Sequence, residues 1–196
     1  MARLSGHFSA LVPQFTHYCL LISTPDIVVD HTEDRYKRCY PYSVLKVSYD
    51  MLPLVEKSRP GYSTIAEKYL DDGHIGFCVN DRDFIASMAW VYYNDKPSKV
   101  RVTYFPLLPN RAWLHADWTN PIYRGKGLHK LLIYHRARYV MELFPQQASP
   151  ILLESNINPC NLASLNNYKK CGFKENGDIY IFKFWKGCFS WKRSLQ

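Results

Sequence analysis

The fold of this chain is decided by the stretch Trp118-Thr119-Asn120-Pro121-Ile122-Tyr123-Arg124-Gly125-Lys126-Gly127-Leu128-His129-Lys130-Leu131-Leu132. An apolar segment leads into a turn that carries Gly125 and Gly127, and an amphipathic stretch follows at once. Glycines at a strand-to-helix turn let the backbone approach a ligand closely, and the first N–H groups of the helix stay unpaired. The positive end of the helix dipole lies at the same place. The sequence therefore predicts an anion-binding loop, most simply for a pyrophosphate.

The pattern of the loop differs from the two common nucleotide-binding motifs. It contains neither the Gly-Lys-Ser/Thr of a P-loop nor a G-x-G-x-x-G run. Residues 124–129 instead resemble the acyl-CoA-binding signature of the GNAT superfamily of N-acetyltransferases, Arg/Gln-x-x-Gly-x-Gly/Ala. The last position is His129, where the family has a small residue.

A second stretch, residues 161–173, resembles the GNAT pattern Asn-x-x-Ala/Ser-x-x-x-Tyr-x-x-x-Gly-Phe. It also has the features of a short helix, because Asn161 is a good N-cap and Gly172 is suited to the residue after the C-cap. Lys169 and Lys170 would lie in the last turn of that helix, where positive charges interact favourably with the negative end of the helix dipole. The two stretches occur in the family's order, and the resemblance covers roughly residues 42–185.

The length and composition indicate a single globular domain. The 196 residues are 47% hydrophobic and 21% charged, and no apolar run is long enough to span a membrane. Residues 1–24 make a poor signal-peptide core, so we expect a cytoplasmic protein. The six cysteines form no C-x-x-C pair, and no His/Cys group has zinc spacing. We therefore expect free thiols and no metal.

The net charge of +8 permits an anionic ligand and makes nucleic acid an alternative partner. However, the basic residues are dispersed, and the tyrosines and tryptophans alternate with aliphatic residues as in core strands. We therefore expect no nucleic-acid binding.

The pattern of apolar residues predicts strands over 42–49, 74–79, 84–93, 100–105, 112–119 and 151–155, with one or two more in 173–185. Helices are expected over 50–57, 63–70, 125–144 and 161–171. This order matches the family's. It implies an α/β (α+β) fold with a mixed, mostly antiparallel central sheet flanked by helices, splayed between the strand before the glycine loop and the next strand. We assign residues 42–196 to a GNAT-like domain. Residues 1–41 form an N-terminal extension that is either helical or contains short strands at 20–22 and 27–29.

The resemblance implies that acetyl-CoA binds at the glycine loop. Its pyrophosphate would meet backbone amides from Gly125 to Lys130, and its pantetheine arm would run beside residues 117–119 and 154–156. The implied cofactor-binding residues are Asp117, Trp118, Thr119, Arg124, Gly125, Lys126, Gly127, Leu128, His129, Lys130, Asn156 and Asn161. Three positions are open for the His129 side chain. It can donate a hydrogen bond to a phosphate oxygen, it can crowd the phosphate and weaken binding of the cofactor, or it can face solvent.

The resemblance also makes Tyr168 the general acid, because a phenol with an ordinary pKa of about 10 can donate at neutral pH. The alternative for Tyr168 is a core aromatic. Candidates for the base are His115, Asp117 and Glu154, of which Glu154 and His115 are preferred. On a regular strand His115 and Asp117 share a face, and a bulge would change that. Glu154 is also compatible with a counter-ion role towards the amine.

The leading hypothesis is thus an acetyl-CoA-dependent N-acetyltransferase that acts on a primary amine. The acceptor would be a small molecule (an amine, an amino sugar or an aminoglycoside) or a protein N-terminus, held by residues 51–69 and 95–110. The alternatives are a catalytically inactive GNAT-fold module that binds CoA or a partner, and a basic nucleic-acid-binding protein. Aromatic residues in 185–191 are compatible with a homodimer contact and equally with a strand packed in the core.

Overall fold

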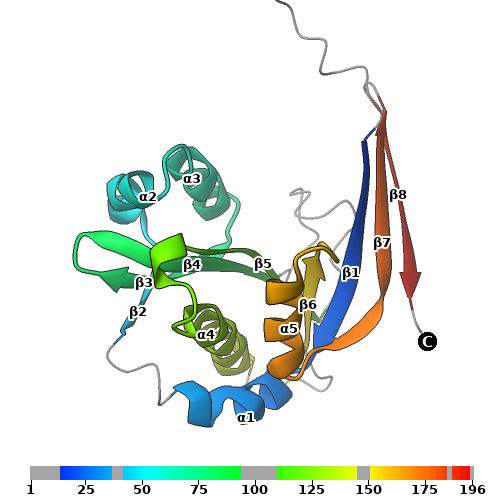
Figure 1. Cartoon of the computed structure of the whole chain (residues 1–196), viewed down its shortest axis with the longest axis horizontal. Helices are drawn as coiled ribbons and strands as arrows, with labels where there is room; N and C mark the ends of the chain where they lie inside the picture. Colours follow the sequence, from blue (N-terminus) through cyan, green and yellow to red (C-terminus); the bar gives the residue numbers. More distant parts are fainter. Residues whose placement is uncertain (1–13, 37–41, 94–109, 145–150, 185–186, 195–196) are drawn as a thin grey trace, which may run out of the picture.

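The computed structural model describes residues 14–36, 42–93, 110–144, 151–184 and 187–194, and its centre is an eight-stranded sheet (Figure 1). The strand order is β2-β3-β4-β5-β6-β1-β7-β8. The strands are β1 Gln14–Ser23, β2 Val44–Lys46, β3 Ile75–Asp81, β4 Phe84–Tyr93, β5 Arg111–Thr119, β6 Leu152–Ile157, β7 Lys174–Phe184 and β8 Gly187–Ser194. The helices are α1 Pro25–Tyr36, α2 Leu52–Ser58, α3 Ser63–Asp71, α4 Leu128–Leu143 and α5 Leu162–Lys170.

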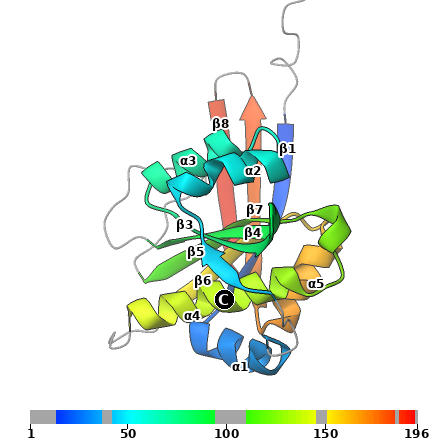
Figure 2. The same ribbon diagram turned by 90° about the vertical axis from the view of Figure 1, so that its left-hand side faces the viewer.

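Helices cover both faces of the sheet. In Figures 1 and 2, α2 and α3 lie on one side of β3, β4 and β5, while α4 lies on the other side with α1 packed against it. Each side has its own apolar cluster. The cluster under α4 includes Leu132 and Ala137, and the cluster under α2 and α3 includes Val55, Ala66 and Trp90. The expected sheet flanked by helices is confirmed.

The N-terminal segment contributes both a strand and a helix. β1 is inserted between β6 and β7 and pairs antiparallel with each. The local pattern of residues 14–23 did not predict this, because a strand's partners are not encoded in its own sequence. The division of the chain at residue 41 stays a prediction about domains, although β1 shares one sheet with the strands that follow that point.

Most other predicted elements are present with shifted ends. The strand expected over 42–49 is reduced to β2, because a 3₁₀ turn over Tyr49–Met51 precedes α2. The helix expected from residue 125 begins at Leu128, because Gly125 and Gly127 both have a φ near +80° that a helix excludes. The strand expected over 100–105 lies outside the described residues.

The C-terminal part of the sheet consists of two long strands. Of the one or two strands expected in 173–185, the structure has one, β7, which continues through residues 176–177 with a bulge in its pairing with β1. β8 pairs with β7 at the sheet's edge. Trp191 on β8 is 47% exposed, and the homodimer contact stays a prediction.

Within the described residues, no helix combines the length and apolar character required to cross a membrane.

The position of the site follows from the junction of β5 and β6, the parallel pair of this sheet. Their ladder runs from Arg111↔Leu152 to Trp113↔Glu154 and ends there, although both strands continue. The sheet is therefore open between the carboxyl ends of β5 and β6, which confirms the expected splay.

Candidate active site

A bulge in β5 decides which way the polar side chains near this opening point. Ala116 has a φ of +53°, and the register with β4 shifts between Met88↔Trp118 and Trp90↔His115. A regular strand would place His115 and Asp117 on one face. The bulge separates them: the His115 ring packs against Tyr69 of α3, whereas Asp117 faces α4 and α5.

A cavity of about 480 Å³ opens at the end of β5, beside the first turn of α4. Its walls come from β5, the glycine loop, α4 and α5. The lining residues are Asp117, Trp118, Thr119, Tyr123, Arg124, Gly125, Gly127, Leu128, His129, Lys130, Asn161, Ala163, Ser164 and Asn167.

The start of α4 gives this cavity the character of an anion site. Gly127 is the N-cap in the left-handed conformation, and the first ladder bond of the helix runs from the Leu131 N–H to the Gly127 carbonyl at 3.1 Å. The N–H groups of Leu128, His129 and Lys130 therefore have no partner within the helix. Together with the helix dipole they favour a phosphate at this end of the cavity.

The turn before the glycine loop is fixed at both ends. Asn120 Oδ1 accepts from the Ile122 N–H at 3.2 Å, which caps the 3₁₀ turn Pro121–Tyr123. The Tyr123 hydroxyl donates to Asp81 Oδ2 at 2.7 Å, so the β3–β4 hairpin anchors the turn.

The structure brings together ten of the twelve residues expected to bind the cofactor. The exceptions are Lys126, whose ammonium lies over the Tyr123 ring, and Asn156, which pairs with Leu20 of β1. Sequence reasoning missed Tyr123, Ala163, Ser164 and Asn167. The last three lie on the first turns of α5, on the side that faces the cavity, and helical spacing from Asn161 was the available signal. Asn161 Oδ1 accepts from the Ser164 N–H at 3.2 Å, so the N-cap prediction is confirmed.

A buried ion pair lies at the inner end of the cavity. Arg136 of α4 is 0% exposed, and its Nη2 lies 2.6 Å from Asp117 Oδ1. The same guanidinium donates to the Trp90 carbonyl at 2.9 Å and to the Leu132 carbonyl at 3.1 Å. Burial opposes ionisation of Asp117, but Arg136, His129 and Tyr168 outweigh it and hold the pKa of this carboxyl well below its ordinary value.

Tyr168 is part of this network. Its hydroxyl donates to Asp117 Oδ2 at 2.5 Å and lies 3.3 Å from Arg136 Nη2, and the residue is 0% exposed. Burial in the first place, and then the neighbouring Asp117, raise the pKa of Tyr168 further above its ordinary value. Because the phenol is committed to Asp117, the geometry favours a positioning role. Its assignment as a general acid stays a prediction.

His129 points inward. Its Nε2 lies 3.1 Å from Asp117 Oδ2, and its Nδ1 lies 3.1 Å from the Asn167 amide nitrogen. The ring also contacts the edge of Tyr168. Of the three possibilities left open by the sequence, the solvent-facing one is wrong. The imidazole fills the space beneath the first helical turn and joins α4 to α5.

The two preferred bases lie in separate surroundings. Glu154 forms an ion pair with Arg111 across the β5–β6 ladder. His115 is 7% exposed, its Nε2 lies 2.8 Å from His74 Nδ1, and its ring stacks on Trp113. Burial, and then His74, hold the pKa of His115 well below its ordinary value, so this imidazole is neutral at neutral pH. Neither residue lines the cavity, and both assignments stay predictions.

The arrangement can seat an anion on the amides of α4 and admit an extended ligand between β5 and β6. A sequence model of the acetyltransferase (GNAT) family matches residues 30–173. A search among curated proteins returned no match.

Solved structures share the fold at low sequence identity. A functionally unknown conserved protein from Staphylococcus epidermidis is 10% identical with a TM-score of 0.59, over 87% of this chain. A GCN5-related N-acetyltransferase-like protein from Streptococcus suis is 13% identical with a TM-score of 0.55, also over 87%. This chain spans 62% of the length of each. AAC(6')-Iy in complex with a CoA-S-monomethyl-acetylneamine bisubstrate analogue is 17% identical with a TM-score of 0.50, and the match covers 68% of this chain and 91% of that one.

Proposed function

This chain belongs to the GNAT family of acetyltransferases, and from that premise we propose that it transfers an acetyl group from acetyl-CoA to a primary amine. One observation carries the proposal. The cavity lies at the carboxyl end of β5, past the point where the β5–β6 ladder ends, and directly at the N-terminus of α4. The N-terminus of α4 suits the pyrophosphate of a nucleotide, and the open edge of β5 suits the extended arm that carries its thiol. A ligand such as acetyl-CoA needs both features side by side.

The residues at the cavity fit such a ligand. The amides of Leu128, His129 and Lys130 would take the pyrophosphate, with the exposed Arg124 at the entrance. The β5–β6 ladder ends at Trp113, and beyond it the Leu114 carbonyl accepts from the Ser155 hydroxyl at 2.9 Å. Further along β5, the backbone of Asp117–Thr119 would pair with the extended arm. Acetyl-CoA, when bound, supplies a thioester carbonyl that a neutral amine can attack. A backbone N–H of β5 beyond the bulge would stabilise the oxyanion that develops.

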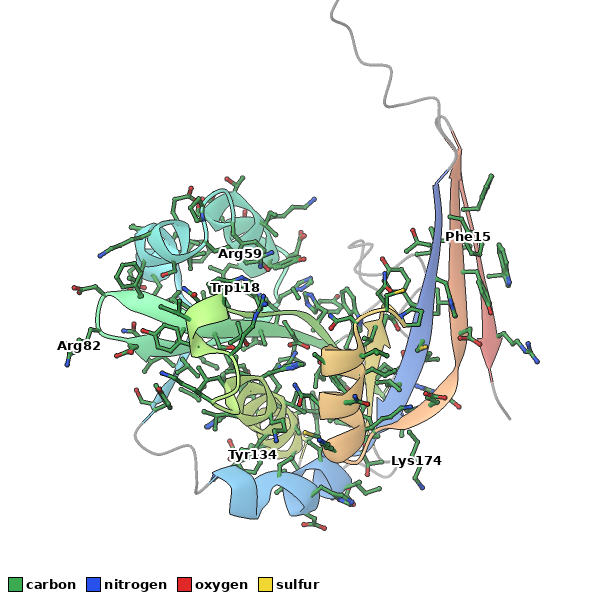
Figure 3. The ribbon with its side chains drawn as sticks, in the orientation of Figure 1. Phe15, Arg59, Arg82, Trp118, Tyr134 and Lys174 are labelled. Carbon is green, nitrogen blue, oxygen red and sulfur yellow. The ribbon has the colours of Figure 1, made fainter. Side chains whose placement is uncertain are left out.

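We place the acceptor on the α2–α3 side of β5. This face carries Arg59, whose guanidinium lies 3.9 Å from the Tyr62 ring centroid and 5.6 Å from that of Trp118 (Figure 3). His115 lies on the same side, beside Tyr69. The acceptor classes are a small amine, an amino sugar, an aminoglycoside or a protein N-terminus. The acetylneamine analogue in AAC(6')-Iy supports an amine acceptor by analogy.

Thermal unfolding with and without acetyl-CoA tests the binding half of the proposal, with CoA and ATP as comparison ligands. A ligand that binds only the native state raises stability by RT ln(1 + [L]/Kd), about 2.7 kcal/mol at 100 Kd. We expect a rise in midpoint with acetyl-CoA and CoA that exceeds the rise with ATP. Equal midpoints with and without acetyl-CoA contradict the proposal. The release of free CoA thiol in an amine screen then tests transfer.

A second candidate function is binding of CoA without transfer, and the closed network around Tyr168 favours it. The phenol, Asp117, Arg136 and His129 contact one another. A midpoint shift with acetyl-CoA, combined with no thiol release for any acceptor class, would select this alternative.

A further inference from the structure

A second group of chemically reactive side chains lies at the other end of the sheet, on β1 and β7. It consists of His17, Cys19 and Asp178, whose nitrogen, sulfur and oxygen atoms all lie within 4.8 Å of one another. His17 Nε2 is 2.7 Å from Asp178 Oδ1. None of the three lines the cavity, so the cluster is independent of the proposed acetyl-transfer site.

Strand geometry explains why the three side chains converge. His17 and Cys19 are two residues apart on β1 and therefore share a face, and Asp178 is the cross-strand partner of Cys19. A bulge follows at once, since Cys19 pairs with Asp178 but Leu21 pairs with Glu175, and Gly177 has a φ of +122°. A bulge changes the direction of the side chains beside it. The three side chains converge in the regular ladder before this bulge, where Asp178 shares the face of Cys19 and lies diagonally opposite His17.

Neighbouring side chains hold the cluster in place. The His17 ring stacks on Tyr180 with centroids 4.7 Å apart and planes 9° from parallel, and Tyr180 stacks on Trp191. Phe15 packs beside Tyr180 on the same strands, which Figure 3 shows well away from α2 and α3. All three cluster residues are partly buried, so their positions are fixed while solvent can still reach them.

We propose that His17, Cys19 and Asp178 bind one Zn²⁺ ion that ties β1 to β7. Imidazole, thiolate and carboxylate are the three common protein ligands of zinc. Zinc bond lengths imply ligand atoms about 3.3 to 3.6 Å apart in a tetrahedral site. The present separations lie on both sides of this range, at 2.7 Å for His17 and Asp178 and at no more than 4.8 Å for the pairs with Cys19. Binding displaces the thiol proton of Cys19 to solvent and leaves the fourth position to water.

The charges of the site suit a divalent cation. A thiolate and a carboxylate together balance the two positive charges of the ion, with a neutral imidazole as the third ligand. The other acidic group near Cys19 is Glu175, which forms an ion pair with Lys169 at 2.6 Å. Sequence spacing predicted no zinc site, because spacing rules detect ligands close in sequence, whereas His17 and Asp178 are 161 positions apart.

Titration of the reduced, metal-free chain with Co²⁺ and Zn²⁺ tests the site. Co²⁺ bound by a thiolate gives a sulfur-to-metal charge-transfer absorption in the near ultraviolet, and competing Zn²⁺ abolishes it. We expect one equivalent of Co²⁺ to produce this absorption, and Zn²⁺ to raise the unfolding midpoint. Absence of the absorption at one equivalent overturns the proposal.

Matched variants assign the ligands. Cys19→Ser is expected to remove the absorption, whereas Cys160→Ser, which alters an exposed free cysteine, leaves it unchanged. His17→Asn and Asp178→Asn keep the thiol and are expected to weaken Zn²⁺ affinity by at least about tenfold, the lower end of the effect of losing an outer-shell partner. Affinity that is unchanged in both variants, or absorption that depends on Cys160, overturns the proposal. None of these readouts depends on acetyl transfer.

Discussion

At the scale of single residues, the most consequential feature is the charge buried beneath the cavity. Arg136 is fully buried, and Asp117 is the carboxylate in contact with it. Removing a charge from water costs several kcal/mol, and its partner offsets that cost only when the geometry is good. Arg136 also uses two backbone carbonyls, so its contacts fix β4, β5 and α4 relative to one another.

Arg136→Met is therefore expected to lower the free energy of unfolding by about 3–5 kcal/mol, because it leaves the Asp117 carboxylate without the buried guanidinium that balances its charge. Urea-induced unfolding measures the change. Arg138→Met is the matched control on the same helix. Arg138 is exposed and pairs with Glu142, so this substitution should cost about 0.5 kcal/mol or less. Adding Asp117→Asn to Arg136→Met should recover part of the loss, and no recovery would argue against an unpaired charge as its cause.

Tyr168→Phe separates a structural role from proton donation. The variant removes a hydrogen bond to a carboxylate, so we expect a loss of about 1.5–3 kcal/mol of stability. On an amine that the chain acetylates, kcat should stay within about tenfold, because the phenol is committed to Asp117. A drop in kcat of about 100-fold or more, with stability unchanged, would restore the general-acid assignment.

At the scale of elements, the sequence predicted what depends on local signals. The glycine loop, α4, α5 with its Asn161 cap, and the strands β3 and β4 each follow from residues close together in the chain. The bulge at Ala116 does not, because alanine has no preference for a positive φ and tertiary contacts impose it. The orientations of His115 and Asp117 depend on that bulge, so their roles could not be predicted from alternation alone.

A negative charge introduced at the N-terminus of α4 tests whether a phosphate binds there. Gly127→Asp places a carboxylate at the N-terminal end of α4 where the pyrophosphate is proposed to lie, and Gly127→Asn has nearly the same shape without the charge. Both bear the cost of a side chain at a φ of +80°, which asparagine and aspartate tolerate better than most residues. We expect the aspartate variant to lose the acetyl-CoA-dependent midpoint shift and the asparagine variant to retain more of it. Equal shifts in the two variants would contradict a phosphate at this position.

At the scale of the whole molecule, buried histidines make stability depend on pH. His74 is 3% exposed, and burial lowers its pKa from 6.5 to about 4. Between these two values the unfolded chain holds a proton that the folded chain does not. The contribution of His74 to stability is therefore complete above about pH 6.5 and is lost progressively as the pH falls towards about 4.

Unfolding free energies measured at a series of pH values across this window test the linkage. His74→Phe keeps an aromatic ring against Tyr69 but cannot titrate, so its stability should fall less steeply with acid. The difference in slope should reach at most about 1.4 kcal/mol per pH unit, the value for one proton. Parallel curves for His74→Phe and the unaltered chain would exclude His74 as a source of the dependence.

The place of β1 between β6 and β7 also determines when, during synthesis, this strand can pair with its neighbours. β1 is among the first described segments to be synthesised, yet His17 and its partner Asp178 are separated by 161 positions. At roughly 5–20 residues per second, a ribosome needs about 8 to 30 s to add that length. For most of this interval, until β6 is synthesised, the apolar Leu20 and Leu21 have neither neighbouring strand available. The nascent chain must therefore hold β1 with both edges unpaired until β6 emerges and with one edge unpaired until β7 follows, which exposes this segment to misassociation during synthesis.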